Sequence, residues 1–545
     1  MKNLIITLVL LSITTVFCAP KHEKMMEGKY EPTWESLSQY GQAPDWFRNA
    51  KFGIWAHWGP QCQPEQGDWY ARHMYDEGSW QYKWHVENYG HPSEFGFKDV
   101  INIWKAEKWD PEKLMALYKR VGAQYFFTLG NHHDNFDLWD SKYHKWNSVN
   151  LGPEQDIVGG WEKAARANGM YFGVSIHSAH AWTWMETAQR ADKEGPMKGI
   201  PYDGKLTQAD GKGKWWEGYD PQELYAQNHP LSVESENTSR IHSQWGWENG
   251  AAIPTEEYFQ NFFDRNVDMI NKYNPDMVYY DDTSMPLWPV SDAGLRTVAH
   301  FYNKSLIDNK GKNEAVVFAK ILTDDQKECL VWDVEKGVPD QIQEKPWQTC
   351  TCLGHWHYDK NTYDRNGYKS AKTVIHMLID IISKNGNMLL SVPMRGDGTI
   401  DDKEEAILNE IANWMDINKE SIFDTRPWTI FGEGPVAEAS NPLNAQGFNE
   451  GRHKPYTAED IRFVTKGDAL YAHVLAWPEN RKITIKSLAE GSPLYEKTID
   501  AVSMLETDIR ISHQRTSEGL IINLPSEIEP SNISLVLKIT NTDNK

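Results

Sequence analysis

Eight short apolar runs alternate with amphipathic stretches between about residue 40 and residue 420, and this alternation limits the possible folds more than any other feature. The runs span residues 51–58, 123–133, 170–177, 276–282, 315–322, 329–335, 347–356 and 387–395. The stretches between them, such as DPEKLMALYKRVG at 110–122, have the apolar spacing and capping residues of helices. Strands separated by helices pair in parallel, and eight of them favour a closed (β/α)8-type barrel over an open sheet.

The pattern changes after residue 425. Short runs with period-two alternation follow one another between Gly, Pro and Asn turns, and none of the segments is typical of a helix. We therefore predict a barrel at residues 30–425 followed by a C-terminal β-sandwich at 426–545. Residues 178–253 are rich in Gly, Trp and Asp and too long for an ordinary connection, so we predict a loop region over one barrel face.

The N-terminal segment predicts export of the chain. Residues 1–19 carry an early positive charge, an apolar run from Leu4 to about Val16 and small residues near the end, as a signal peptide does. A secreted or periplasmic protein is expected. Lipidation at Cys18 is an alternative that the bulky Phe17 disfavours. No later stretch has about 18 consecutive apolar residues, so we expect no membrane span.

The charge balance argues against a nucleic-acid partner. There are 77 acidic and 56 basic residues, and the resulting net charge of −21 has the wrong sign for binding phosphate backbones. The chain also has 25 Trp and 24 Tyr, whose rings suit sugar faces as well as protein cores. The four cysteines beyond residue 19 do not have the spacing of zinc-binding pairs, so we expect mostly free, buried thiols.

Polar residues follow the apolar runs. In a barrel of this type the active site forms at the carboxyl ends of the strands, so these side chains should share one pocket. They are His57, Asn131, His132, His133, Asp134, His177, Asp281, Lys320, Asp333, Glu335 and Arg395.

Three chemistries could use such a pocket. A metal-dependent barrel hydrolase needs two histidines one residue apart on the first strand, and that strand offers only His57. No Gly-x-Ser-x-Gly turn supports a serine nucleophile. Glycoside hydrolysis needs two carboxyl groups, hydroxyl-binding groups and an aromatic platform, and Asp281, Glu335, the histidines and the tryptophans supply them. We therefore expect neither a metal ion nor another cofactor.

Several of these segments resemble, in order, the motifs of α-L-fucosidases of glycoside hydrolase family 29, over about residues 40–435. They are KFGIWAHWG, FFTLGNHHDNFDLWDSKY, YNPDMVYYDD, WQTCTCLGHWHYD and LIDIISKNGNMLLSVPMRGDGTI. The resemblance implies an enzyme that removes terminal α-L-fucose from fucosylated oligosaccharides or glycoconjugates with retention, through a covalent fucosyl-enzyme. Retention requires two carboxyl groups about 5 to 5.5 Å apart.

The resemblance also implies the catalytic roles. The family nucleophile closes a P-D-x-x-W/Y-x-D strand, which makes it Asp281 here. Asp282 stands where the family commonly has Gly, and could either raise the pKa of Asp281 by repulsion or turn into solvent. The proton donor is less fixed in the family. We choose Glu335, which ends a strand before a Gly turn, with Asp333 and Glu344 as alternatives.

Further residues match substrate-binding positions of the family. His57, His132 and His133 resemble partners of the fucose hydroxyls, as imidazole both donates and accepts hydrogen bonds. Asp68 and Trp69 match an acidic–aromatic pair that is usually Glu-Trp. Where many members have a tyrosine, this chain has GVSIHSAH, so His177 or His180 is the expected replacement. Trp347 and Trp356 are candidates for packing on the C6 methyl group, and Lys320 and Arg395 for binding substrate or the catalytic carboxylates.

Other interpretations remain open at this point. Fucose and L-galactose differ only at C6, so an α-L-galactosidase is an alternative. A carbohydrate-binding protein with a decayed barrel is another, although the intact Asp281 and Glu335 argue against it. We expect recognition of the leaving group in the 178–253 loop, at Trp215 and Trp216.

Overall fold

The structure of the protein is a computed structural model, and it describes residues 21–236, 245–439, 441–443, 447–505, 507 and 511–541. The predicted signal peptide at 1–19, with Cys18, lies outside these described residues. Within the described part of the chain, no helix is long and apolar enough to cross a membrane. Cys62, Cys329, Cys350 and Cys352 are buried free thiols, as predicted.

Eight parallel strands close into a barrel in which each strand pairs with the next and β8 pairs with β1. The strands are β1 (Phe52–Ala56), β2 (Tyr125–Asn131), β3 (Tyr171–Ile176), β4 (Met277–Tyr280), β5 (Val316–Ala319), β6 (Val331–Glu335), β7 (Trp347–Cys352) and β8 (Gly386–Ser391). All eight predicted runs are therefore barrel strands in sequence order, and the predicted barrel is confirmed.

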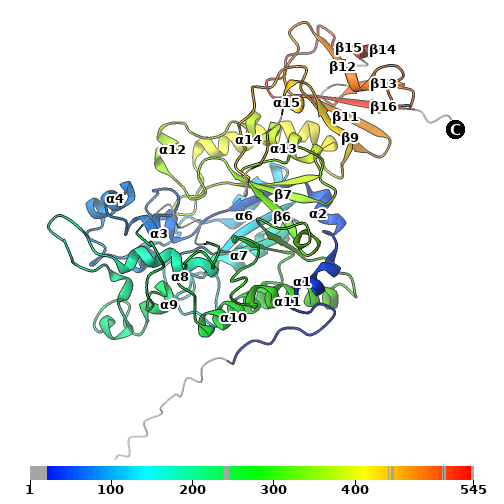
Figure 1. The fold of residues 1–545 in the computed structure, drawn as a ribbon. Coiled ribbons are helices and arrows are strands. Elements are labelled where there is room, and N and C mark those ends of the chain that lie inside the picture. The colour runs from blue at the N-terminus through cyan, green and yellow to red at the C-terminus, as the bar shows by residue number, and fades with distance from the viewer. Residues whose placement is uncertain are drawn as a thin grey trace, which may run out of the picture.

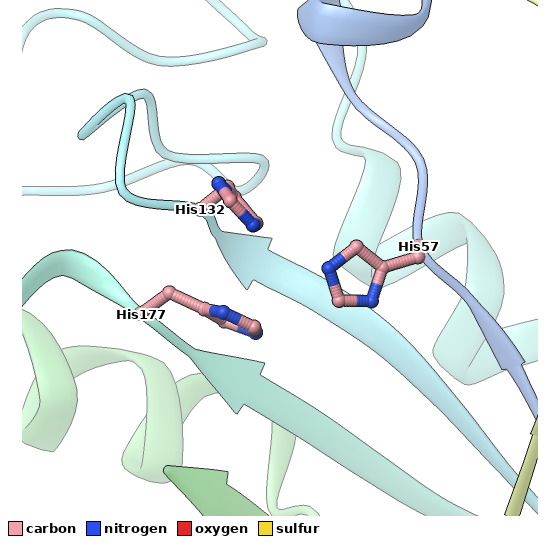
Figure 2. A group of neighbouring side chains, drawn as sticks. All are labelled: His57, His132 and His177. Carbon is pink, nitrogen blue, oxygen red and sulfur yellow. The ribbon is translucent and has the colours of Figure 1, made fainter. Parts of the chain in front are cut away.

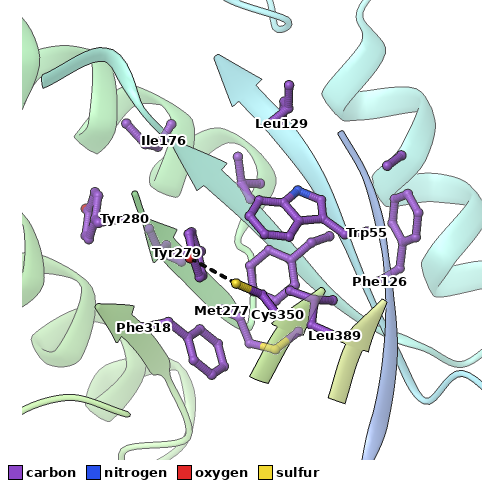
Figure 3. Packing of buried hydrophobic residues seen from close by; sticks show 14 of the residues in the cluster. Trp55, Phe126, Leu129, Ile176, Met277, Tyr279, Tyr280, Phe318, Cys350 and Leu389 are labelled. Atoms are coloured by element: carbon purple, nitrogen blue, oxygen red, sulfur yellow. Dashed lines mark hydrogen bonds between the residues drawn. The ribbon is translucent and has the colours of Figure 1, made fainter. Parts of the chain in front are cut away.

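The barrel interior is filled by side chains that meet across it. Tyr125 Oη of β2 donates a hydrogen bond to Gln348 Oε1 of β7 at 2.9 Å. Tyr279 of β4 and Cys350 of β7 are joined by a hydrogen bond of 3.6 Å between Oη and Sγ (Figure 3). Because alternate strand residues point inward, these large groups form a packed core, and the rim at the carboxyl ends is left for a polar site.

The helices around the barrel follow the predicted segments. The longer ones are α6 (Pro111–Arg120), α7 (Ile157–Ala167), α10 (Glu256–Tyr273), α11 (Ala293–Asp308), α13 (Ala371–Ser383) and α14 (Asp402–Asn418). Asp110 caps α6 as expected, since its Oδ1 accepts a hydrogen bond of 2.9 Å from Lys113 N. The shorter helices are α1 (Trp34–Leu37), α2 (Asp45–Ala50), α3 (Tyr70–His73), α4 (Trp80–Asn88), α5 (Phe97–Ile103), α8 (Ala181–Trp184), α9 (Pro221–Tyr225), α12 (Lys360–Asp364) and α15 (Pro435–Glu438).

The long segment after β3 contains the short helices α8 and α9 and packs on α5 through one buried carboxylate. Asp203 accepts hydrogen bonds from Tyr75 Oη at 2.6 Å, Tyr225 Oη at 2.7 Å and Lys98 Nζ at 2.7 Å. A buried charge with three donors is strongly oriented, which holds the part of the segment around Asp203 against α5.

Two antiparallel sheets form the C-terminal domain, so the predicted β-domain after the barrel is confirmed. Their strands are β9 (Arg426–Glu433), β10 (Ile461–Lys466), β11 (Ala469–Val474), β12 (Lys482–Ile485), β13 (Ala501–Met504), β14 (Ser512–Thr516), β15 (Gly519–Asn523) and β16 (Leu535–Thr540). One sheet has the order β13-β16-β11-β10-β9 and the other β12-β15-β14. Apolar side chains from both sheets, such as Leu470 and Leu520, belong to one buried cluster.

The C-terminal domain lies against α13 of the barrel (Figure 1). Arg462 Nε of β10 donates to Asp380 Oδ1 of α13 at 2.5 Å, and Lys384 Nζ contacts the other oxygen of this carboxylate at 2.9 Å. Burial would raise the pKa of Asp380, but the two cations hold it well below its usual value. The domains are therefore joined by a buried ionic cluster as well as by apolar contacts.

Candidate active site

Each of the first seven barrel strands is followed by, or ends in, a predicted residue that lines one cavity at the carboxyl end of the barrel. This cavity has a volume of about 370 Å³, a size typical of small-molecule sites. The predicted residues among its lining are His57, Asp68, Trp69, His132, His177, Asp281, Lys320, Glu335 and Trp356. Strand direction explains this convergence, because residues that follow parallel strands all lie at the same end.

Two carboxyl groups contact the same ammonium group in the lining of the cavity. Lys320 Nζ lies 2.6 Å from Asp281 Oδ1 and 2.5 Å from Glu335 Oε2. These two contacts to one nitrogen limit the separation of the two oxygens to about 5.1 Å. Asp281 follows β4, Lys320 follows β5 and Glu335 ends β6, so three neighbouring strands bring the groups together.

The surroundings of Asp281 favour its ionised form. Burial alone would raise the pKa of this carboxyl, but Lys320 and the nearby rings of His133 and His177 hold it well below its usual value. His177 Nδ1 lies 3.1 Å and His133 Nε2 3.4 Å from Asp281 Oδ2. The pKa of Lys320 is raised well above its ordinary value, because the attraction of Asp281 and Glu335 outweighs burial. The cavity therefore holds an anionic oxygen at Asp281.

Asp282 does not turn into solvent, and the pKa of Asp281 is lowered although this second carboxyl group follows it directly in the chain. The Asp282 side chain is buried, and Oδ1 accepts hydrogen bonds from His180 Nε2 at 3.0 Å and Thr283 N at 2.6 Å. His180 stacks on Trp247 with ring centroids 4.7 Å apart. The two histidines that could stand in for the family's tyrosine therefore have different partners. His177 contacts Asp281, and His180 contacts Asp282.

Three histidines from three successive strands point toward one another (Figure 2). His57, His132 and His177 follow β1, β2 and β3, and burial lowers the pKa of each below its usual value, to about 4 for His177. They are therefore neutral near pH 7, and each ring offers one donor and one acceptor. Gln61 Nε2 lies 2.8 Å from His132 Nδ1 and orients that ring.

The same imidazoles have the chemistry of a metal-binding group. Nitrogens of His57, His132 and His177 lie within 4.8 Å of one another, as do ligand atoms of His133, His177 and Asp281. Neutral imidazoles bind divalent transition metals as well as sugar hydroxyls. These residues could hold such an ion, and the expectation that no metal is used stays a prediction.

Asp68, Trp69 and Trp356 are also part of the cavity lining. Asp68 Oδ1 accepts a hydrogen bond of 2.7 Å from His357 N, and His355 Nδ1 lies 3.4 Å from Oδ2. Burial would raise the pKa of Asp68, but these histidine contacts hold it well below its usual value. The ring of Trp356 lies 5.5 Å from that of His57, between centroids.

His357 was not among the predicted site residues. Its ring lies in the cavity wall, with centroids 4.7 Å from His132 and 5.0 Å from His57. The sequence could have indicated it, because His357 directly follows Trp356 in the LGHWHYD segment after β7. Trp245 and Phe448 also line the cavity, and neither had a motif that marked it.

His133 is fully buried and is not part of the cavity lining, although its Nε2 contacts Asp281. Four further predicted residues lie elsewhere. Arg395 is not in the cavity lining, because its Nε hydrogen-bonds Tyr358 Oη at 3.3 Å in the loop after β8. Trp347 begins β7 and so lies at the opposite end of the barrel from the site. Trp215 and Trp216 do not line the cavity either: Trp216 is buried, and Trp215 Nε1 bonds to Asp99 at 2.7 Å.

The two alternative proton donors are also positioned away from the cavity. Asp333 points into the barrel core, where it accepts hydrogen bonds from Tyr279 Oη at 3.1 Å and Gln348 Nε2 at 2.9 Å. Glu344 precedes β7 and lines a different depression near Trp347. Among the three candidate donors, Glu335 alone lines the cavity beside Asp281.

Known proteins resemble this chain over most of its length. The chain is 24% identical over 530 residues to the tissue α-L-fucosidase of Bos taurus, covering 94% of this chain and 91% of the relative. It is 23% identical over 528 residues to the human tissue enzyme, covering 94% and 92%. The solved Thermotoga maritima α-fucosidase in complex with fucose has the same fold, with a TM-score of 0.65, 24% identity and coverage of 94% of this chain and all of that one.

Family models agree with both domains. The model described as α-L-fucosidase matches residues 17–420, and that of the α-L-fucosidase C-terminal domain matches residues 454–540. With a match over most of the barrel and a second one over the β-domain, the chain belongs to the α-L-fucosidase family of glycoside hydrolases, family 29.

Proposed function

We propose that this chain is a retaining exo-glycosidase that hydrolyses terminal α-L-fucose from fucosylated glycans through a covalent fucosyl-enzyme. The observation that carries the proposal is the contact of Asp281 and Glu335 with the same Lys320 nitrogen. The two oxygens that contact this nitrogen can be at most about 5.1 Å apart, which supports the close carboxyl pair of a retaining enzyme, about 5 to 5.5 Å. An inverting enzyme needs about 6.5 to 9.5 Å, to leave room for water.

The neutral histidines account for substrate binding. Fucose presents adjacent ring hydroxyls, each of which donates and accepts, and His57, His132 and His177 line the cavity where such hydroxyls would lie. His132 and His177 each offer them one ring nitrogen, because the other nitrogen contacts Gln61 or Asp281. Trp356 supplies an apolar face beside them. The small cavity, closed at its base by the barrel core, favours one terminal sugar over the middle of a chain.

In the first step the leaving group departs and fucose becomes covalently bonded to the enzyme. Glu335 donates its proton to the glycosidic oxygen, which departs with the leaving group as a hydroxyl. Asp281, held ionised by Lys320, attacks the anomeric carbon as that bond breaks and stabilises the positive charge that develops on the ring. Lys320 acts as a positioning residue for both carboxylates.

In the second step water releases the fucose. Glu335, now a carboxylate, removes a proton from water, and the resulting hydroxide attacks the anomeric carbon. The bond to Asp281 breaks, which restores the Asp281 carboxylate and the protonated Glu335. Two inversions at the same carbon leave the released sugar in its original configuration.

The experiment is hydrolysis of an aryl α-L-fucoside by wild type and Asp281→Ala, with NMR of the first sugar anomer released. We expect α-L-fucose from wild type and a loss of about a thousandfold or more in the variant. A 2-fluoro-fucosyl fluoride should label the peptide that contains Asp281. First release of the β-anomer would contradict retention, and activity within tenfold of wild type in Asp281→Ala would exclude the nucleophile assignment.

Export of the chain is also a proposal, and it rests on the signal-like sequence of residues 1–19. The N-terminal sequence of the mature protein tests it. A chain that retained residues 1–19 in the cytoplasm would contradict it.

A further inference from the structure

A short segment of the C-terminal region reaches back to the proton donor. Residues 447–450 lie between α15 and β10, more than a hundred positions after β6. Phe448 N donates to Glu335 O at 2.9 Å, and Glu450 N donates to Lys336 O at 3.0 Å. The 447–450 segment therefore runs alongside the carboxyl end of β6 as a short parallel partner.

Side chains fasten this segment to the loop that follows Glu335. Asn449 is 2% exposed, and its amide accepts from Val338 N at 2.9 Å and donates to Val338 O at 3.0 Å. Glu450 accepts from Thr351 Oγ1 of β7 at 2.6 Å and pairs with Lys369 Nζ at 2.8 Å. Buried polar groups that are fully paired in this way permit little movement.

The backbone approach is too close for any residue but glycine at position 447. Gly447 has φ +123°, and a Cβ atom there would lie 2.3 Å from Glu335 O. A side chain would thus force the segment away from β6. The contact with Glu335 is a specific fit, and it fixes where the next residue, Phe448, must lie.

The side chain of Phe448 lines the active-site cavity together with Glu335, Lys336 and Trp356. Glu335 protonates the oxygen that leaves, so the first sugar of the leaving group must lie on the Glu335 side of the cavity. An aromatic ring in the lining of the same cavity as that carboxyl can pack on the apolar face of this sugar.

We propose that Phe448 is a specificity-determining residue for the leaving group, contributed to the barrel's active site by the C-terminal region of the chain. This inference rests on the proposed function. It replaces Trp215 and Trp216 as the leaving-group contact, since neither lines the cavity. The ring of Phe448 recognises a sugar or other group that offers an apolar face next to the fucosyl bond.

The test compares two substrates on Phe448→Ala. α-L-Fucosyl fluoride has a one-atom leaving group that cannot reach the ring, whereas fucosylated disaccharides of different linkage carry a sugar there. We expect kcat/KM on the preferred disaccharide to fall roughly threefold to tenfold, as for loss of one aromatic contact, with a clearly smaller change on the fluoride. Phe448→Tyr, which keeps the ring, should retain the wild-type ratio of the two rates.

Phe431→Ala is the matched control, because Phe431 is a partly buried phenylalanine of β9 that does not line this cavity. It should leave the ratio unchanged, and thermal unfolding of each variant reports whether the domains remain folded. Equal losses on both substrates, or unchanged rates on every disaccharide, would overturn the inference. A wild-type protein inactive on the fluoride itself would instead refute the proposed function, and the inference with it.

Discussion

Replacing Lys320 with methionine tests the electrostatic arrangement of the site directly. The change keeps the length of the side chain and removes the charge that lies 2.6 Å from Asp281 Oδ1 and 2.5 Å from Glu335 Oε2. An opposite charge this close typically lowers a carboxyl pKa by about 1 to 3 pH units. Its removal should therefore raise the pKa of Asp281 by about that amount, which corresponds to about 1.4 to 4 kcal/mol.

The direction of the change in the pH profile follows from the mechanism. Asp281 must be ionised to attack, and its pKa lies well below 3.8. Protonation of Asp281 should therefore not lower the wild-type kcat/KM at any pH above 3.8. In Lys320→Met the acidic limb should move upward by about one to three pH units. The assay is kcat/KM for an aryl α-L-fucoside from pH 3 to 8.

Stability should change in a related way. A carboxyl group whose pKa is lowered in the folded state stabilises the fold at pH values above its pKa in the unfolded chain. That contribution is lost as the pH falls through the lowered pKa of the folded state. The difference in unfolding free energy between wild type and Lys320→Met should accordingly be largest near neutral pH and shrink in acid. Lys108→Met is the control, because Lys108 forms an exposed pair with Asp397. An acidic limb that stays in place, or moves downward, would refute the reasoning.

Three further results are expected. Glu335→Ala should lose less activity on aryl fucosides than on glycans and recover with azide, whereas equal losses would contradict its role as proton donor. Trp245→Ala should raise KM because the ring lines the cavity, while Trp215→Ala should alter the relative rates on differently linked fucosides by no more than about twofold. Arg462→Met should destabilise the protein by about 3 to 5 kcal/mol in denaturant unfolding, because Asp380 loses a buried partner; a change under 1 kcal/mol would show that the contact is not needed.

The tryptophan surplus shows how composition can mislead. It suggested sugar-binding surfaces, and four tryptophans do line the cavity: Trp55, Trp69, Trp245 and Trp356. Many others, including Trp104, Trp139 and Trp161, are fully buried in the core away from it. Ring count alone cannot distinguish the two uses, because both depend on the same apolar faces.

The sequence by itself determined the barrel and the residues at its strand ends. Apolar periodicity is a local property, and parallel strands necessarily bring their carboxyl ends together, so His57, His177, Asp281, Lys320 and Glu335 could be assigned to one pocket from their positions alone.

Only the tertiary structure decided which of the remaining residues join that pocket. Arg395 turns to Tyr358, Asp333 points into the core, and Phe448 arrives from the C-terminal region through backbone hydrogen bonds to Glu335. The path of a loop depends on contacts between residues far apart in the chain, and the direction of a side chain depends on the one buried group that it bonds. These contacts produce no periodic pattern in the sequence, so the placements can be seen only in the folded chain.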